Sequence, residues 1–160
     1  FSQRATALGM TVVGVNRSRK TPANVAWAPL DELLAASDYV SLQVPLTEET
    51  RCMIDDRALR LMRSTAFLIN TSRGGLIDHA ALAAALARGG LAGAGLDVQS
   101  PEPPDLNKSP YCDPRVIVTP HVAFQSSEAT LELRTRVARQ VADFLRGRTP
   151  ENVINPSVLT

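Results

Sequence analysis

Three side chains that could act together on a small acid stand far apart in the sequence: Arg73, Glu102 and His121. An imidazole exchanges a proton near neutral pH, so His121 suits general acid and base catalysis. The planar guanidinium of Arg73 matches a carboxylate, and a carboxylate at Glu102 would favour the charged imidazole if it lay beside it. Residue type alone leaves ordinary alternatives open, namely a locally satisfied histidine, a solvated glutamate and a surface arginine in a turn.

Five short apolar runs must position these side chains. Each is rich in Val, Ile or Leu and lacks a two-residue alternation, which is typical of strands buried on both faces. The runs are TVVGV after Gly9, YVSLQV, AFLIN, AGAGLDV and VIVT. Helical patterns alternate with them, after the candidate caps Asp55 and Asp78 and over Ser127 to Arg146. This alternation predicts an α/β fold with a doubly wound parallel sheet.

Polar residues gather where these runs end. In an open parallel sheet, ligands bind beyond the carboxyl ends of the strands, so the segments that follow the runs are candidates for a binding site. They supply Asn16, Arg17, Ser18 and Arg19; Val44 and Pro45; Thr71, Ser72 and Arg73; Asp97; and His121. Gly74 and Gly75 would let the backbone approach a ligand closely. Asp97 stands in an apolar run, where a carboxylate is costly unless it is hydrogen-bonded.

The composition indicates one ordinary domain and argues against several classes of partner. With 160 residues, 44% of them hydrophobic, the chain can form a sizeable core. A net charge of +1 without a basic stripe gives no reason to expect nucleic acid, and no apolar stretch is long enough to predict a membrane span. Cys52 and Cys112 form no zinc pattern, so we expect no metal and favour a reducing compartment, the cytoplasm. His79, at a polar helix start, is expected at the surface.

Four ordered segments resemble the D-isomer-specific 2-hydroxyacid dehydrogenases: ASDYVSLQVPLTEETRCMI, AFLINTSRGGLID, AGLDVQSPEPP and VIVTPHVAFQSSEA. The resemblance covers almost the whole chain and implies hydride transfer between NAD(P)H and a small 2-oxo acid or D-2-hydroxy acid. It implies that Arg73 binds the substrate carboxylate and carbonyl and that His121 is the acid and base, with Glu102 as its partner. It also implies that Asp97 lies against the nicotinamide carboxamide.

The same resemblance narrows the function further. Glu102 argues against the formate dehydrogenase branch, which has Gln at this place. The segment TPHVAFQSSEA favours a substrate of the glyoxylate or hydroxypyruvate type. Because family members are commonly dimers that associate through the cofactor domain, the resemblance also implies a homodimer. The alternative is a non-catalytic NAD(P)-binding subunit of the same fold, either regulatory or a remnant.

The turn after the first apolar run bears on the choice of cofactor. An acidic residue there would bond the ribose 2′-hydroxyl of NAD, whereas arginine accommodates a 2′-phosphate. The sequence is NRSRK, with Arg17, Ser18 and Arg19 together and no Asp or Glu. NADP is therefore preferred over NAD. Asn16 could still bond a ribose hydroxyl, and a solvated basic turn is the ordinary alternative.

The start of the chain departs from the family pattern. Phe1 opens on what reads as the last turns of a helix, and the strand and glycine-rich phosphate-binding turn expected before it are absent. That strand is central in the order 3-2-1-4-5-6, so TVVGV and YVSLQV should stay unpaired with each other. We expect a Rossmann-like NAD(P)-binding domain over 1–146, truncated at its N-terminus, and a tail over 147–160. The isolated chain is not expected to turn over substrate.

Overall fold

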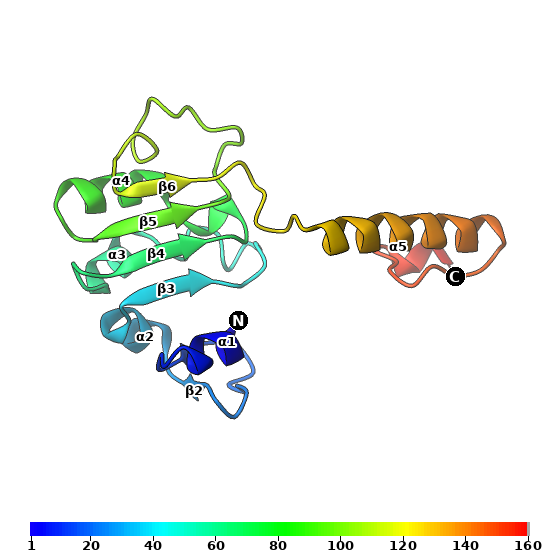
Figure 1. Cartoon of the computed structure of the whole chain (residues 1–160), viewed down its shortest axis with the longest axis horizontal. Coiled ribbons are helices and arrows are strands. Elements are labelled where there is room, and N and C mark those ends of the chain that lie inside the picture. The colour runs from blue at the N-terminus through cyan, green and yellow to red at the C-terminus, as the bar shows by residue number, and fades with distance from the viewer. Residues whose placement is uncertain (160) are drawn as a thin grey trace. The chain divides into compact units, whose positions relative to one another are not determined.

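The computed structural model describes residues 1–159. Their contacts divide the chain into two compact units, Phe1–His121 and Val122–Thr160 (Figure 1). All strands of the described residues lie in the first unit, and the second is built on one long helix. The assignment of 1–146 to one domain and of 147–160 to a tail stays a prediction.

Four parallel strands form the main sheet of the first unit. In spatial order they are β3 (Tyr39–Leu42), β4 (Phe67–Asn70), β5 (Gly93–Leu96) and β6 (Val116–Val118) (Figure 1). The pairing aligns the last residue of each strand with the last residue of its neighbour. The apolar runs are therefore strands, and their carboxyl ends share one edge as predicted.

The first apolar run belongs to a separate, two-stranded sheet. β1 (Val13–Gly14) pairs in parallel with β2 (Ala26–Trp27), and within residues 1–159 no pairing joins β1 to β3. β1 and β3 both line a cavity of about 430 Å³, to which β1 contributes Gly14 and β3 contributes Leu42. The prediction that these two runs stay unpaired is confirmed. The sequence does not predict β2, because it is only two residues long and carries no apolar run.

Helices connect the strands, and aspartates fix where two of them begin. The helices of the first unit are α1 (Ser2–Ala7), α2 (Leu30–Ala36), α3 (Asp56–Leu61) and α4 (His79–Ala87), with a 3-10 turn, η1, at Gly74–Leu76. The Asp55 carboxylate accepts a hydrogen bond from a backbone N–H in the first turn of α3. Asp78 accepts two such bonds at the start of α4. Both caps are the ones the sequence predicts.

The hydrophobic core joins the main sheet to these helices. Fully buried leucines come from α2, α3 and α4 and from the central strands, among them Leu34, Leu59, Leu68, Leu82 and Leu96. α2 packs against α3, and α3 packs against α4. Burying one leucine side chain stabilises a fold by about 1.5–3 kcal/mol. The core therefore fixes the strand ends from which the candidate site residues project.

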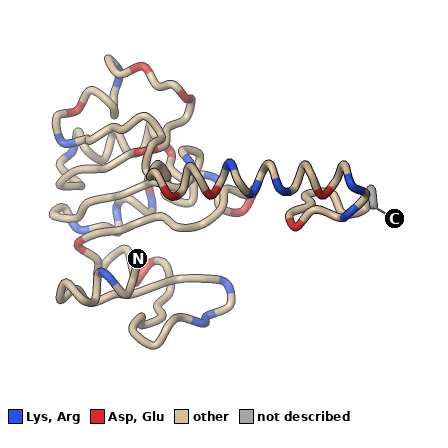
Figure 2. Tube along the Cα trace, turned by 45° about the vertical axis from the view of Figure 1, so that its right-hand side comes forward, with Lys and Arg blue, Asp and Glu red and all other residues tan. Residues whose placement is uncertain are grey.

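The second unit contains one amphipathic helix. α5 (Ser127–Leu145) begins at its cap Ser126, and a 3-10 turn, η2 (Pro156–Leu159), follows it. Acidic and basic residues both occur along α5 (Figure 2). The helix itself is predicted correctly. Four of its apolar side chains are exposed in this unit: Val137, Val141, Phe144 and Leu145. Among residues 1–159, no helix is long and apolar enough to cross a bilayer.

Candidate active site

The turn after β4 is held by the buried side chain of Asn70. Its amide nitrogen donates to the carbonyl oxygen of Arg73 at 2.9 Å, and its amide oxygen accepts from the N–H of Ser72 at 3.0 Å. The Ser72 hydroxyl donates to the carbonyl oxygen of Leu42 at 2.7 Å, which ties the turn to the end of β3. Asn70 was missed as a site residue. The only signal for it is a polar amide directly after the apolar residues of β4.

Arg73 projects from this turn into solvent. Its Nη1 donates to the carbonyl oxygen of Ser72 at 2.7 Å. The next residue, Gly74, is buried so closely against Gln99 that an added Cβ would lie 1.9 Å from the Gln99 carbonyl oxygen. A side chain at this position would push the two segments apart. The glycine therefore brings the turn that carries Arg73 against the segment that follows β5.

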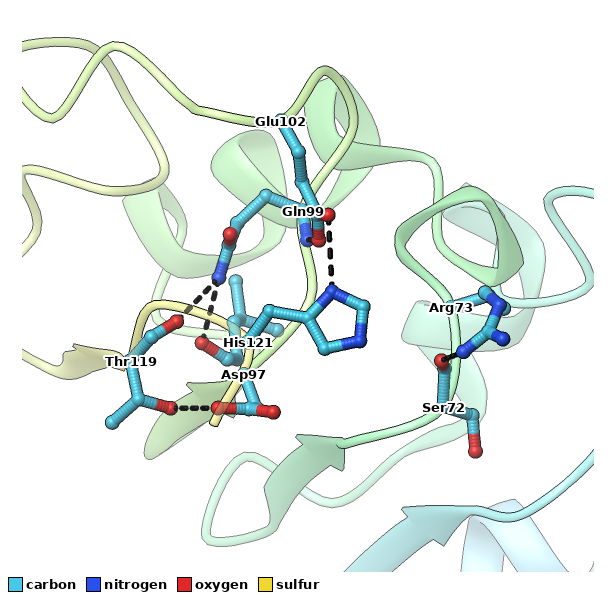
Figure 3. A network of polar contacts seen from close by, with 8 residues as sticks. Ser72, Arg73, Asp97, Gln99, Glu102, Thr119 and His121 are labelled. Carbon is cyan, nitrogen blue, oxygen red and sulfur yellow. Dashed lines mark hydrogen bonds and ion pairs between the residues drawn. The ribbon is translucent and has the colours of Figure 1, made fainter. Parts of the chain in front are cut away.

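The ends of β5 and β6 are joined by a buried polar network (Figure 3). Asp97, only 4% exposed, accepts a 2.6 Å hydrogen bond from the Thr119 hydroxyl. The Gln99 amide donates to the carbonyl oxygens of Leu96 and Thr119 at 2.9 and 3.1 Å. The backbone N–H of His121 donates to the Asp97 carbonyl oxygen at 2.9 Å. These bonds satisfy the carboxylate that the sequence places in an apolar run, and they fix the backbone that carries His121.

The imidazole of His121 lies beside the carboxylate of Glu102. Nδ1 of the histidine is 3.1 Å from Oε2 of the glutamate, whose other oxygen accepts from the Gln99 N–H at 2.8 Å. The Gln99 N–H, followed by His121 and the charge of Arg73, holds the pKa of Glu102 below its ordinary range. An ionised Glu102 can only accept, so Nδ1 carries a proton and donates a hydrogen bond to it, which orients the ring.

The three predicted catalytic residues therefore come together at one edge of the sheet. The second ring nitrogen of His121 faces the side on which Arg73 lies (Figure 3). The backbone of His121 has φ 55°, in the left-handed region that few non-glycine residues adopt. The hydrogen bond from its N–H to the Asp97 carbonyl oxygen helps to hold this conformation, in which the ring contacts Glu102.

Because the pKa of Glu102 is lowered in the folded chain, this residue makes the free energy of unfolding depend on pH. Its pKa in the folded chain lies below the ordinary 4.5, so the unfolded chain binds more protons between the two values. The stabilisation by Glu102 is complete above pH 4.5 and is lost as the pH falls through the lowered value. We expect the free energy of unfolding to fall more steeply with acid in the wild type than in Glu102→Gln, measured by urea unfolding at a series of pH values. Parallel pH curves for the two proteins would contradict this.

The basic turn after β1 is folded by its own polar groups. The Asn16 amide donates to the carbonyl oxygen of Lys20 at 2.6 Å, and the Ser18 hydroxyl donates to Asn16 at 3.3 Å. Arg17 forms an ion pair with Glu49, and the guanidinium of Arg19 lies 5.1 Å from the ring centroid of Trp27. Two cationic side chains are thus held near the carboxyl end of β1. Their neighbour Asn16 lines the cavity beside β1.

The remaining predicted binding residues occupy the loops after β3 and β4. Val44 is partly buried against the core and lines the same cavity as Asn16. The carbonyl oxygen of Pro45 accepts from the Thr50 hydroxyl at 2.7 Å, and Thr71 is exposed. Within the described residues, His, Cys, Asp and Glu form no group of three that could hold a metal ion.

His79 does not lie at the surface as the sequence predicts. It is half-buried, and its ring contacts the Gly74 carbonyl and the Tyr111 hydroxyl. The prediction is wrong because a polar helix start is usually solvated, whereas here a loop from elsewhere in the chain covers it. Tyr111 was also missed, since nothing in its local sequence indicates a partner.

Comparison with known proteins places the chain in a family. The model of the D-isomer specific 2-hydroxyacid dehydrogenase, NAD binding domain, matches residues 1–123. Glyoxylate reductase of Thermococcus litoralis is 39% identical and covers 100% of this chain but only 49% of its own length. Glycerate dehydrogenase of Methylorubrum extorquens is 42% identical over 96% of this chain and 48% of its own length. The solved structure of an acyclic imino acid reductase (Bsp5) in complex with NADPH and D-Arg is 31% identical, with a TM-score of 0.83 over 96% of this chain and 48% of that one.

These matches define the class of the fold as a Rossmann-type nucleotide-binding domain. The chain belongs to the D-isomer-specific 2-hydroxyacid dehydrogenase family. It spans about half the length of the curated relatives it matches.

Proposed function

We propose that the complete gene product transfers a hydride between NAD(P)H and a small 2-oxo acid of the glyoxylate or hydroxypyruvate type, giving the D-2-hydroxy acid. The observation that carries the proposal is the convergence of Arg73, Glu102 and His121 at the carboxyl edge of the parallel sheet in a chain of this family. The relatives named glyoxylate reductase and glycerate dehydrogenase support this substrate class. We further propose a cytoplasmic homodimer whose partners are small molecules rather than nucleic acids or membranes.

The proposed chemistry assigns each side chain one task. A bound nicotinamide supplies the hydride. The Arg73 guanidinium binds the substrate carboxylate through its planar fork and so fixes the orientation of the carbonyl. Negative charge develops on the carbonyl oxygen, and protonated His121 stabilises it and donates the proton from Nε2. Glu102 keeps the ring in the required orientation through its contact with Nδ1. In the oxidative direction neutral His121 takes the proton back.

The residues at two places fit a dinucleotide. The turn after β1 offers arginine side chains and the Ser18 hydroxyl to a 2′-phosphate, and residues 16–20 themselves include no carboxylate. Arg17 is paired with Glu49, so Arg19 is the arginine assigned to the phosphate. Asn16 and Val44 also line the cavity to which β1 contributes Val13 and Gly14. Buried Asp97 would lie against the carboxamide. We therefore propose NADPH as the preferred cofactor, with NADH as the alternative.

Turnover by the complete gene product tests the proposed function. Purified protein is mixed with NADPH and either glyoxylate or hydroxypyruvate, and consumption is followed by the absorbance of the reduced nicotinamide. We expect saturable consumption of NADPH and release of the D-isomer where the product is chiral. Tight NADPH binding without turnover of either acid would instead favour the non-catalytic alternative, which gains no support from relatives that are named as enzymes.

The cofactor preference makes a separate prediction. Replacing Arg19 with Ala removes one charge-assisted contact to the 2′-phosphate, so KM for NADPH should rise by about tenfold or more. KM for NADH should hardly change, because NADH lacks that phosphate. Arg60→Ala is the matched control, since Arg60 is an exposed arginine on α3 paired with Asp56. An equal rise in KM for both cofactors would contradict the assignment.

A further inference from the structure

His79 and Tyr111 join two loops of the candidate site. Nε2 of His79, the first residue of α4, lies 3.2 Å from the carbonyl oxygen of Gly74. Nδ1 lies 3.1 Å from the Tyr111 hydroxyl, and the ring centroids are 5.5 Å apart. Gly74 directly follows Arg73, whereas Tyr111 belongs to the proline-rich segment 99–114 that also carries Glu102. One imidazole thus contacts both loops.

The chemistry of the partners assigns the protons in this contact. A carbonyl oxygen can only accept, so Nε2 carries a proton and donates it to Gly74. In the neutral ring Nδ1 then accepts, and the Tyr111 hydroxyl donates to it. Burial lowers the pKa of His79, against the opposing effects of the Gly74 carbonyl and the Asp78 carboxylate, and this favours the neutral ring. The Ser100 carbonyl oxygen, 3.4 Å from the same hydroxyl, is the more distant acceptor.

We propose that His79 and Tyr111 are positioning residues. They hold the turn that carries Arg73 in a fixed position relative to the segment 99–114, which carries Glu102. On the side of the turn, the His79 imidazole holds the carbonyl group of Gly74, the residue after Arg73. Towards the loop, Tyr111 lies beside Ser100, whose neighbour Gln99 donates its N–H to Glu102. Both side chains act through Arg73 and Glu102 rather than on the substrate. The inference rests on the proposed function, because it gives these two loops a common task.

The contact through His79 and Tyr111 adds to one that lies closer to the strands, between Gly74 and Gln99. The backbone of Gly74 already touches the backbone of Gln99, and that close contact fixes one point between the two segments. Both segments are also tied at their bases, where β4 pairs with β5 and the Asp97 N–H donates to the Asn70 carbonyl oxygen at 3.0 Å, but neither of these contacts reaches the part of the loop beyond Ser100. The His79 and Tyr111 pair supplies a second point, beyond Ser100 along the loop. Two points together define the angle between the turn and the loop, and so the separation of the guanidinium from the carboxylate.

Tyr111→Phe tests the proposal in the complete gene product, because it removes only the hydroxyl. We expect KM for glyoxylate to rise about three- to tenfold, the effect of one lost hydrogen bond on the placement of Arg73. KM for NADPH should be unchanged. Tyr39→Phe is the matched control, since Tyr39 is an exposed ring stacked on Phe67 at the opposite end of the sheet. It should leave both constants unchanged.

A second variant shows whether the two side chains act as a pair. His79→Phe should raise KM for glyoxylate to a similar extent, and the double variant should be no worse than either single variant. Multiplied effects in the double variant would overturn the pairing.

Hydrogen exchange separates this proposal from the proposed function. If the wild type shows no turnover, the proposed function fails, but the contact between the loops is still measurable. Amide exchange over residues 73–79 and 99–114 should quicken in Tyr111→Phe and not in Tyr39→Phe. Exchange rates in both segments that match the wild type would overturn the positioning role, whatever the activity.

Discussion

Replacing His121 with Asn is expected to lower kcat for glyoxylate reduction by about 10²–10⁴-fold, the usual contribution of a general acid. The imidazole is the group beside Glu102 that can donate a proton to the developing oxyanion, and Asn cannot. Asn is chosen because its short polar side chain tolerates the left-handed backbone that His121 adopts at φ 55°. Steady-state kinetics with NADPH measure the effect, and an unchanged Tm shows that the fold is retained. KM for NADPH should be nearly unchanged.

Glu102→Gln provides the comparison. It keeps the shape of the side chain but replaces the charged acceptor beside the His121 ring with a neutral amide, so the loss in kcat should be smaller, about tenfold. Because Glu102 acts through His121, the double variant should be no slower than His121→Asn alone. A His121→Asn enzyme with the kcat of the wild type would remove the mechanism.

Replacing Gly74 with Ala is expected to destabilise the first unit by about 3 kcal/mol, near the upper range for overpacking a well-packed contact. The added Cβ would lie 1.9 Å from the carbonyl oxygen of Gln99 and 2.2 Å from its carbon, and both atoms belong to the backbone. Neither segment can relieve the clash by a side-chain rotation. Urea unfolding measures the loss, and glyoxylate turnover should fall as well, since Arg73 moves with the turn.

Gly95→Ala is the matched control for this change. Gly95 lies in β5 of the same sheet, and a Cβ there would meet only the Ile69 side chain, at 4.0 Å. That distance is an ordinary contact, so the free energy of unfolding should stay close to that of the wild type. Equal destabilisation by the two substitutions would show that the close approach at Gly74 is not the cause.

Apolar runs were sufficient to predict β3 to β6 and the edge where the candidate residues meet. Runs of Val, Ile and Leu carry their strand signal in local composition, and parallel strands connected by helices must end along the same side. The expected burial on both faces does not hold for β6, where Ile117 is 71% exposed. The helix caps Asp55 and Asp78 were predicted for a similar reason, because a cap and the N–H groups it accepts from lie within three residues. β2 escaped prediction because two residues are too few to show a pattern.

The residues that hold the site together could not be predicted in this way. The side chains of Asn70 and Gln99 bind backbone groups of the turns after the strands. Which backbone groups need such a partner depends on contacts between separate strands, and a local sequence pattern does not reveal them. His79 meets Tyr111 across 32 residues, through a loop whose path its prolines do not reveal. The sequence thus predicted the groups suited to chemistry, whereas the groups that orient them emerged only from the packed structure.

The hydrogen-bond ladder of the main sheet also sets the distance between the segment that carries Arg73 and the segment that carries His121. The turn with Arg73 follows β4 and His121 follows β6, with β5 between them. Neighbouring strands lie about 4.8 Å apart, so the two chain segments leave the sheet roughly 10 Å from each other. The separation of the two segments therefore belongs to the ladder itself. Lengthening either loop would not change where that segment leaves the sheet.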